Sequence, residues 1–100
     1  MKGASYRPAP DAAMLLAPTT DDLIKARIAT DERVDEAVAA LMANPRTGRF
    51  AIADGFHLDL TVVVRRSKHA RMLLNDPDAT EGLRRGTFRK AILLARPVKA

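Results

Sequence analysis

Residues 56–64 read FHLDLTVVV, and this stretch decides the fold class. Every second residue from position 56 to position 64 is apolar, which is the period of a strand that buries one face. The second half of the stretch is rich in β-branched side chains, which favour strands. The pattern therefore predicts a strand over residues 56–65.

The segment before it, residues 49–52, is expected to pair antiparallel with this strand. A two-residue turn would place Phe50 on the face opposite the core. A three-residue loop over 53–55 instead pairs Phe50 with Leu58 and keeps the large apolar side chains on one face. We therefore expect the longer loop, with a left-handed bulge at Gly55 and with Ile52 opposite Phe56.

Two helices are predicted before this hairpin. The first begins at Thr19-Thr20, whose hydroxyls can cap helix N–H groups, and two aspartates follow in its first turn. The second helix spans 31–43, where apolar residues recur with the period of a helix, and Thr30-Asp31 marks its start. Asn44-Pro45 is expected to end it.

Further helices are predicted after the hairpin. Ser67 is the expected cap of a short helix over 68–75. Asp78 lies three residues before a glutamate, which is the spacing of a capping box for a helix that two glycines then weaken. Residues 87–95 fit either a helix or a third strand, and their alanines and leucines favour the helix.

These elements predict an α+β protein in which N-terminal helices pack on a small antiparallel β-hairpin, about 49–52 and 56–65, followed by C-terminal helices. Three prolines in the first 18 residues predict a flexible N-terminal arm over 1–10. A single domain is expected over 11–96, and Pro97 is expected to leave 97–100 as a frayed tail.

Charge is distributed unevenly along the chain. Residues 65–100 hold ten Lys or Arg against three acids, a net charge of +7, whereas residues 1–64 have a net charge of −2. A surface of one sign attracts polyanions or acidic proteins. Eight side chains are therefore the candidate site for nucleic acid or for an acidic partner: Arg65, Arg66, Lys68, Arg71, Arg84, Arg85, Arg89 and Lys90.

Our leading hypothesis is a small basic protein that contacts the phosphates of duplex DNA in a regulatory or accessory role, as a possible homodimer. The alternative is an interaction module, such as an inhibitor or adaptor of a phage or mobile element, that docks its basic face on an acidic protein. A third outcome is a solvated basic face that keeps the protein soluble, or one that forms salt bridges to the acidic part, 31–36, of the helix over 31–43. That helix would be repelled by phosphate, so a standard winged-helix recognition mode is not expected.

Other chemistries find little support in the sequence. The chain has no cysteine, and His57 with Asp59 is too small a set for a metal site, so no metal and no cofactor are expected. No serine lies in a nucleophile elbow, and we expect no enzymatic activity. Tyr6 is the one aromatic residue not needed for the core, which disfavours base stacking on single strands. The absence of cysteine and of long apolar runs indicates a cytoplasmic protein with no membrane contact.

Overall fold

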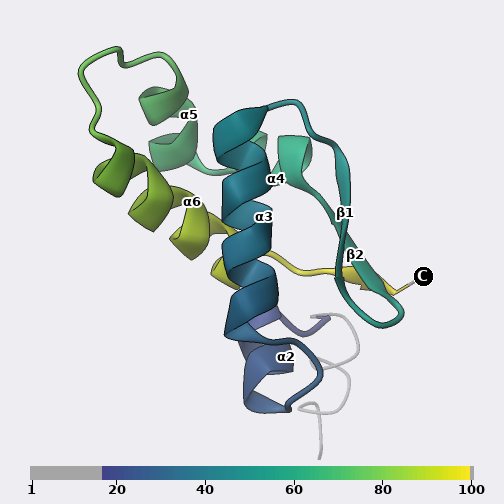
Figure 1. The fold of residues 1–100 in the computed structure, drawn as a ribbon. Helices are drawn as coiled ribbons and strands as arrows, with labels where there is room; N and C mark the ends of the chain where they lie inside the picture. The colour runs from purple at the N-terminus through teal and green to yellow at the C-terminus, as the bar shows by residue number, and fades with distance from the viewer. Residues whose placement is uncertain (1–16, 100) are drawn as a thin grey trace, which may run out of the picture.

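The computed structural model describes residues 17–99, so the predicted arm over 1–10 lies outside the described residues. The chain forms helices and strands in the order α2 (Thr20–Lys25), α3 (Asp31–Ala43), β1 (Arg49–Ala53), β2 (Phe56–Asp59), α4 (Leu60–Arg66), α5 (Lys68–Leu74), α6 (Glu81–Leu94) and β3 (Val98–Lys99). The predicted α+β class is confirmed. Helix α3 runs through the centre, with α6 packed on one side and β1 on the other (Figure 1).

The sheet has three antiparallel strands in the order β1-β2-β3. In place of the expected frayed tail, Val98 pairs with His57 and Lys99 pairs with Phe56. Pro97 is buried, which anchors the segment that leads into β3. The short third strand covers one edge of the hairpin, and an isolated hairpin would be marginally stable in water.

The hairpin register was predicted in part. Phe50 lies opposite Leu58 as expected, and Gly55 has a left-handed φ of 77°. However, Ala53 rather than Ile52 pairs with Phe56, and the register shifts between Ala51 and Ala53. The turn is therefore the two-residue form, and the irregularity at Ile52 provides the extra residue that was expected in the loop.

The predicted strand over 56–65 is wrong beyond Asp59, where α4 begins. The Asp59 carboxylate accepts hydrogen bonds from the backbone N–H groups of Thr61 and Val62, which caps this helix. Leu60 and the two residues three and four positions later are buried, as on one face of a helix. The apolar run fits both periods, and the cap at Asp59 decides between them.

Side-chain caps set the other helix boundaries. Thr19 and Asp22 form a reciprocal capping box at the start of α2, and Thr30 caps α3 as expected. Hydrogen bonding of the Asp22 carboxyl, first by the Thr19 backbone N–H and second by the Thr19 side chain, lowers the pKa of this carboxyl. Helix α6 is capped by Thr80, whose hydroxyl accepts a hydrogen bond from the Leu83 N–H, and not by Asp78 as expected.

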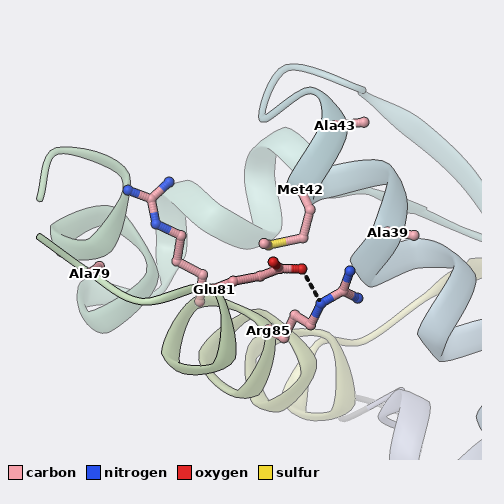
Figure 2. A pocket seen from close by; sticks show the side chains of 7 residues that line it. Ala39, Met42, Ala43, Ala79, Glu81 and Arg85 are labelled. Carbon is pink, nitrogen blue, oxygen red and sulfur yellow. Dashed lines mark hydrogen bonds and ion pairs between the residues drawn. The ribbon is translucent and has the colours of Figure 1, made fainter. Parts of the chain in front are cut away.

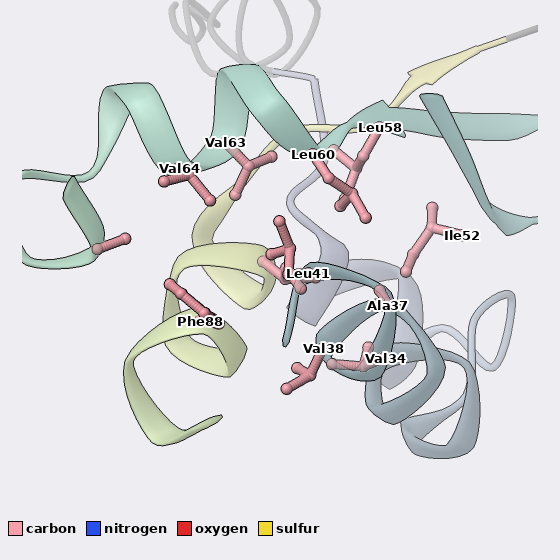
Figure 3. Packing of buried hydrophobic residues seen from close by; sticks show 12 residues of the cluster. Val34, Ala37, Val38, Leu41, Ile52, Leu58, Leu60, Val63, Val64 and Phe88 are labelled. Carbon is pink, nitrogen blue, oxygen red and sulfur yellow. The ribbon is translucent and has the colours of Figure 1, made fainter. Parts of the chain in front are cut away.

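The core lies where α3, α4, α6 and the hairpin meet. Its most deeply buried large side chains are Phe88, Leu41, Ile52, Leu60, Ile92 and Val34. Figure 3 shows Leu41 from α3, Phe88 from α6 and Val64 from α4 pointing into one cluster. Buried Thr20 ties α2 to the end of α6, because its backbone N–H donates to the Ala95 carbonyl at 2.8 Å.

Candidate nucleic-acid interface

The structure divides the eight predicted cations into two groups. Arg65 and Arg66 end α4, and Lys68 and Arg71 lie on α5, so these four share one corner of the molecule. The other four lie on α6: Arg84, Arg85, Arg89 and Lys90.

Arg89 is engaged inside the molecule. Its Nη2 lies 2.7 Å from Asp31 Oδ1 and its Nη1 lies 2.5 Å from Asp35 Oδ1, so one guanidinium joins α6 to two carboxylates of α3. One guanidinium beside two carboxylates gives a local formal charge of −1, which does not attract a phosphate. The salt bridge to the acidic helix, one of the three outcomes considered from sequence, is thus present at this residue.

Arg84 and Arg85 are also committed to local partners. Arg84 is half-buried, and its Nη2 donates to the Asp76 carbonyl at 2.9 Å. Arg85 Nε lies 3.1 Å from Glu81 Oε2 one turn earlier, in an exposed pair that Figure 2 shows beside Met42 in a shallow groove between α3 and α6. Exposed ion pairs of this kind are weak, so the Arg85 guanidinium can still contact an external anion.

The α4–α5 corner, by which we mean Arg65, Arg66, Lys68 and Arg71, is different. Ser67 is both the C-cap of α4 and the N-cap of α5, and the two helices therefore meet at a single residue. All four cations are exposed, and within residues 17–99 no carboxylate lies in ion-pair distance of any of them. The sequence from 60 to 75 contains no acid.

Lys90 belongs to another surface. It lies on the outer side of α6, where it lines a groove with Leu83, Leu94 and the first residues of α5. Both leucines are exposed. From the sequence, this segment was predicted only as a helix weakened by glycines, and the exposed surface was not predicted. The signal that could have found this surface is the spacing of Leu83 and Leu94, which are eleven residues apart and therefore share a helix face.

The outward pair His57 and Asp59 does not form a metal site. Asp59 caps α4, while the His57 ring nitrogens lie 3.2 and 3.4 Å from Arg49 Nη2. Across the described range 17–99, no three His, Cys, Asp or Glu side chains group in a way that could hold a metal ion. In the same range, no helix is both long and apolar enough to cross a membrane.

No protein family, curated protein or solved structure matches this chain. Two surfaces of the molecule have a chemistry that indicates what it can bind. These surfaces are an acid-free cationic corner on α4 and α5 and an apolar groove on the outer side of α6.

Proposed function

We propose that this protein binds duplex nucleic acid through phosphate contacts of Arg65, Arg66, Lys68 and Arg71, in an accessory or regulatory role in the cytoplasm. The observation that carries the proposal is the α4–α5 corner itself. Four exposed cations occupy two consecutive helices in a stretch of sequence without an acid. Arginine offers phosphate a planar fork of donors, and three of the four cations are arginines.

The other members of the predicted site support this function less. Arg89 is neutralised by Asp31 and Asp35, and Arg84 is held by the Asp76 carbonyl. Contacts to phosphates position a protein on a duplex but carry no sequence information. We therefore propose binding with little sequence preference, in which the corner supplies the main electrostatic attraction.

The size of the corner sets the expected salt dependence. Four neutralised phosphates correspond to a slope of about −3.6 in log K against log salt concentration. Between about 50 and 200 mM salt, affinity should then fall by about two orders of magnitude. A homodimer would double the contacts and steepen the slope accordingly.

The experiment is a fluorescence anisotropy titration of two labelled duplexes of unrelated sequence, at low and at moderate salt. We expect saturable binding to both duplexes at low salt and a steep loss at moderate salt. Failure to bind either duplex at low salt would contradict the proposal. Tight binding whose affinity is the same at low and at moderate salt would contradict binding through phosphate contacts.

A further inference from the structure

A second surface lies beside the α4–α5 corner and has a different character. It is a groove of about 590 Å³ between the outer side of α6 and the beginning of α5. Its lining residues are Ser67, His69, Gly82, Leu83, Gly86, Thr87, Lys90, Ala91 and Leu94. Most of this surface comes from the side of α6 that faces away from buried Phe88 and Ile92.

The groove exposes two large apolar side chains. Leu83 is 53% exposed and Leu94 is 64% exposed, although both belong to a well-formed helix of 14 residues. They are eleven residues apart, which is three helical turns and about 16 Å along the axis. An exposed strip of this length with an apolar side chain at each end matches the apolar face of a short partner helix.

The fold of the described residues does not require the two glycines in the same strip. Neither Gly82 nor Gly86 has a positive φ, so the backbone does not require glycine there. Among the described residues outside the helix's own backbone, no heavy atom lies within 4 Å of the position that a Cβ would take at either residue. Each glycine weakens the helix by about 1 kcal/mol relative to alanine. Their effect on the outer face is to let another backbone approach α6 closely.

Charge selects the kind of partner. Lys90 stands between the two leucines in sequence, His69 lines the opposite wall, and no carboxylate is among the described residues that line the groove. A second copy that presented this same face would bring another Lys90 and no carboxylate. The Asp31 and Asp35 carboxylates of such a copy are already bound by its own Arg89.

We propose that this groove docks an acidic amphipathic helix of a partner protein. Apolar side chains of the partner helix, spaced at i, i+4 and i+7, lie between Leu83 and Leu94. Aspartate or glutamate residues beside that stripe face Lys90. None of the four cations of the α4–α5 corner lines the groove, although Ser67 and His69 flank Lys68, so the docking contacts are not the ones proposed for phosphate.

The test uses a labelled synthetic peptide of three to four helical turns, with leucine at helical spacing and glutamate elsewhere. Two matched peptides serve as probes of specificity: one has lysine in place of glutamate, and the other has serine in place of leucine. We expect saturable binding of the acidic leucine peptide and at least about tenfold weaker binding of both others. Equal binding of the acidic and basic peptides would overturn the proposal.

Two variants of the full chain locate the docking site. Gly86→Gln adds bulk to the floor of the groove and should weaken peptide binding at least about tenfold. Ala39→Gln introduces the same side chain, one heavy atom less in added bulk, at an exposed position on α3 in the groove of Figure 2, and should leave binding unchanged. Gly86→Gln should raise the melting temperature, since glutamine favours helix, so lost binding cannot be attributed to unfolding.

Two further readouts separate this proposal from its competitors. Duplex binding should be the same for Gly86→Gln and for the unsubstituted protein, whatever the outcome of the duplex titration. In sedimentation, we expect Gly86→Gln to leave the oligomeric state of the protein unchanged. A concentration-dependent dimer that Gly86→Gln abolishes would identify a second copy of the chain as the occupant of the groove and would overturn the proposal. Unchanged peptide affinity in Gly86→Gln would also overturn it.

Discussion

Arg89 and Asp31 are 58 residues apart in the chain, yet Arg89 Nη2 and Asp31 Oδ1 lie 2.7 Å apart. Asp35, one turn further along α3, takes the second arm of the same guanidinium. The basic C-terminal third of the sequence is therefore partly matched by the acidic helix of the same chain. The positive charge that has no carboxylate partner among the described residues is concentrated at the α4–α5 corner.

The Arg89 bridge should stabilise the packing of α6 on α3 modestly. Its carboxylates are well exposed, so we expect Arg89→Gln to lower the free energy of unfolding by about 1 kcal/mol or less. Urea unfolding of Arg89→Gln, Asp31→Asn and the double variant would measure the coupling. Strictly additive effects of the two substitutions would contradict an energetic role for the bridge.

Arg27 occupies a backbone position that suits glycine. Its φ is 63°, and the hydrogen bonds from Ile28 N–H to the Leu23 carbonyl and from Arg27 N–H to the Ile24 carbonyl form a Schellman motif at the end of α2. Arg27→Gly should raise the free energy of unfolding by about 1 kcal/mol. Arg27→Ala is the control, because it removes the same charge and keeps the Cβ. Equal stability of the two variants would show that backbone strain at this position is absent.

Asp59 marks the change from strand to helix. Asp59→Ala leaves the N–H groups of Thr61 and Val62 without their acceptor and should reduce stability by about 1 kcal/mol. Asp59→Asn retains a capping oxygen and should lose much less. Circular dichroism and thermal melts of both variants would measure this difference. If residues 60–65 were strand, the two substitutions would instead have similar effects.

Asp22 should contribute to acid sensitivity. Its folded-state pKa is lowered from the ordinary value of 3.8 by hydrogen bonds from Thr19. The ionised carboxyl therefore stabilises the fold above the unfolded pKa, and this stabilisation is lost as pH falls through the folded pKa. Unfolding midpoints followed from neutral to acidic pH should fall less steeply for Asp22→Asn than for the unsubstituted protein. Asp21→Asn, which removes the same charge but leaves the capping box, should keep the steeper fall.

Most of the helix boundaries could be predicted because they depend on local chemistry. Thr19, Thr30 and Ser67 are capping residues directly before helical patterns, and all three cap helices in the structure. The end of β2 could not be predicted from periodicity, because Leu60–Val64 has apolar residues at both strand and helix spacing. The cap at Asp59 was a readable signal that the apolar alternation concealed.

The sequence identified the cationic residues of the candidate site but not which of them lie together on the surface. Sequence shows which residues are cationic, whereas the fold shows which of them are engaged: Arg89 binds carboxylates 54 and 58 residues away, and Arg84 binds a carbonyl eight residues earlier. Pairing of β3 with β2 is likewise a long-range contact with no local signal beyond Val98. The spacing of Leu83 and Leu94 places both on one face of α6, but only the packing of the helix shows that this face is exposed.

The most direct test of the central claim compares two single-charge variants in duplex binding. Arg66→Gln removes one charge from the α4–α5 corner, and Arg27→Gln removes one charge from the loop between α2 and α3, at the opposite end of α3 (Figure 1). We predict that Arg66→Gln reduces the salt slope by about 1 and that Arg27→Gln leaves it unchanged. An equal reduction in both variants would show that net charge, and not the corner, attracts the duplex.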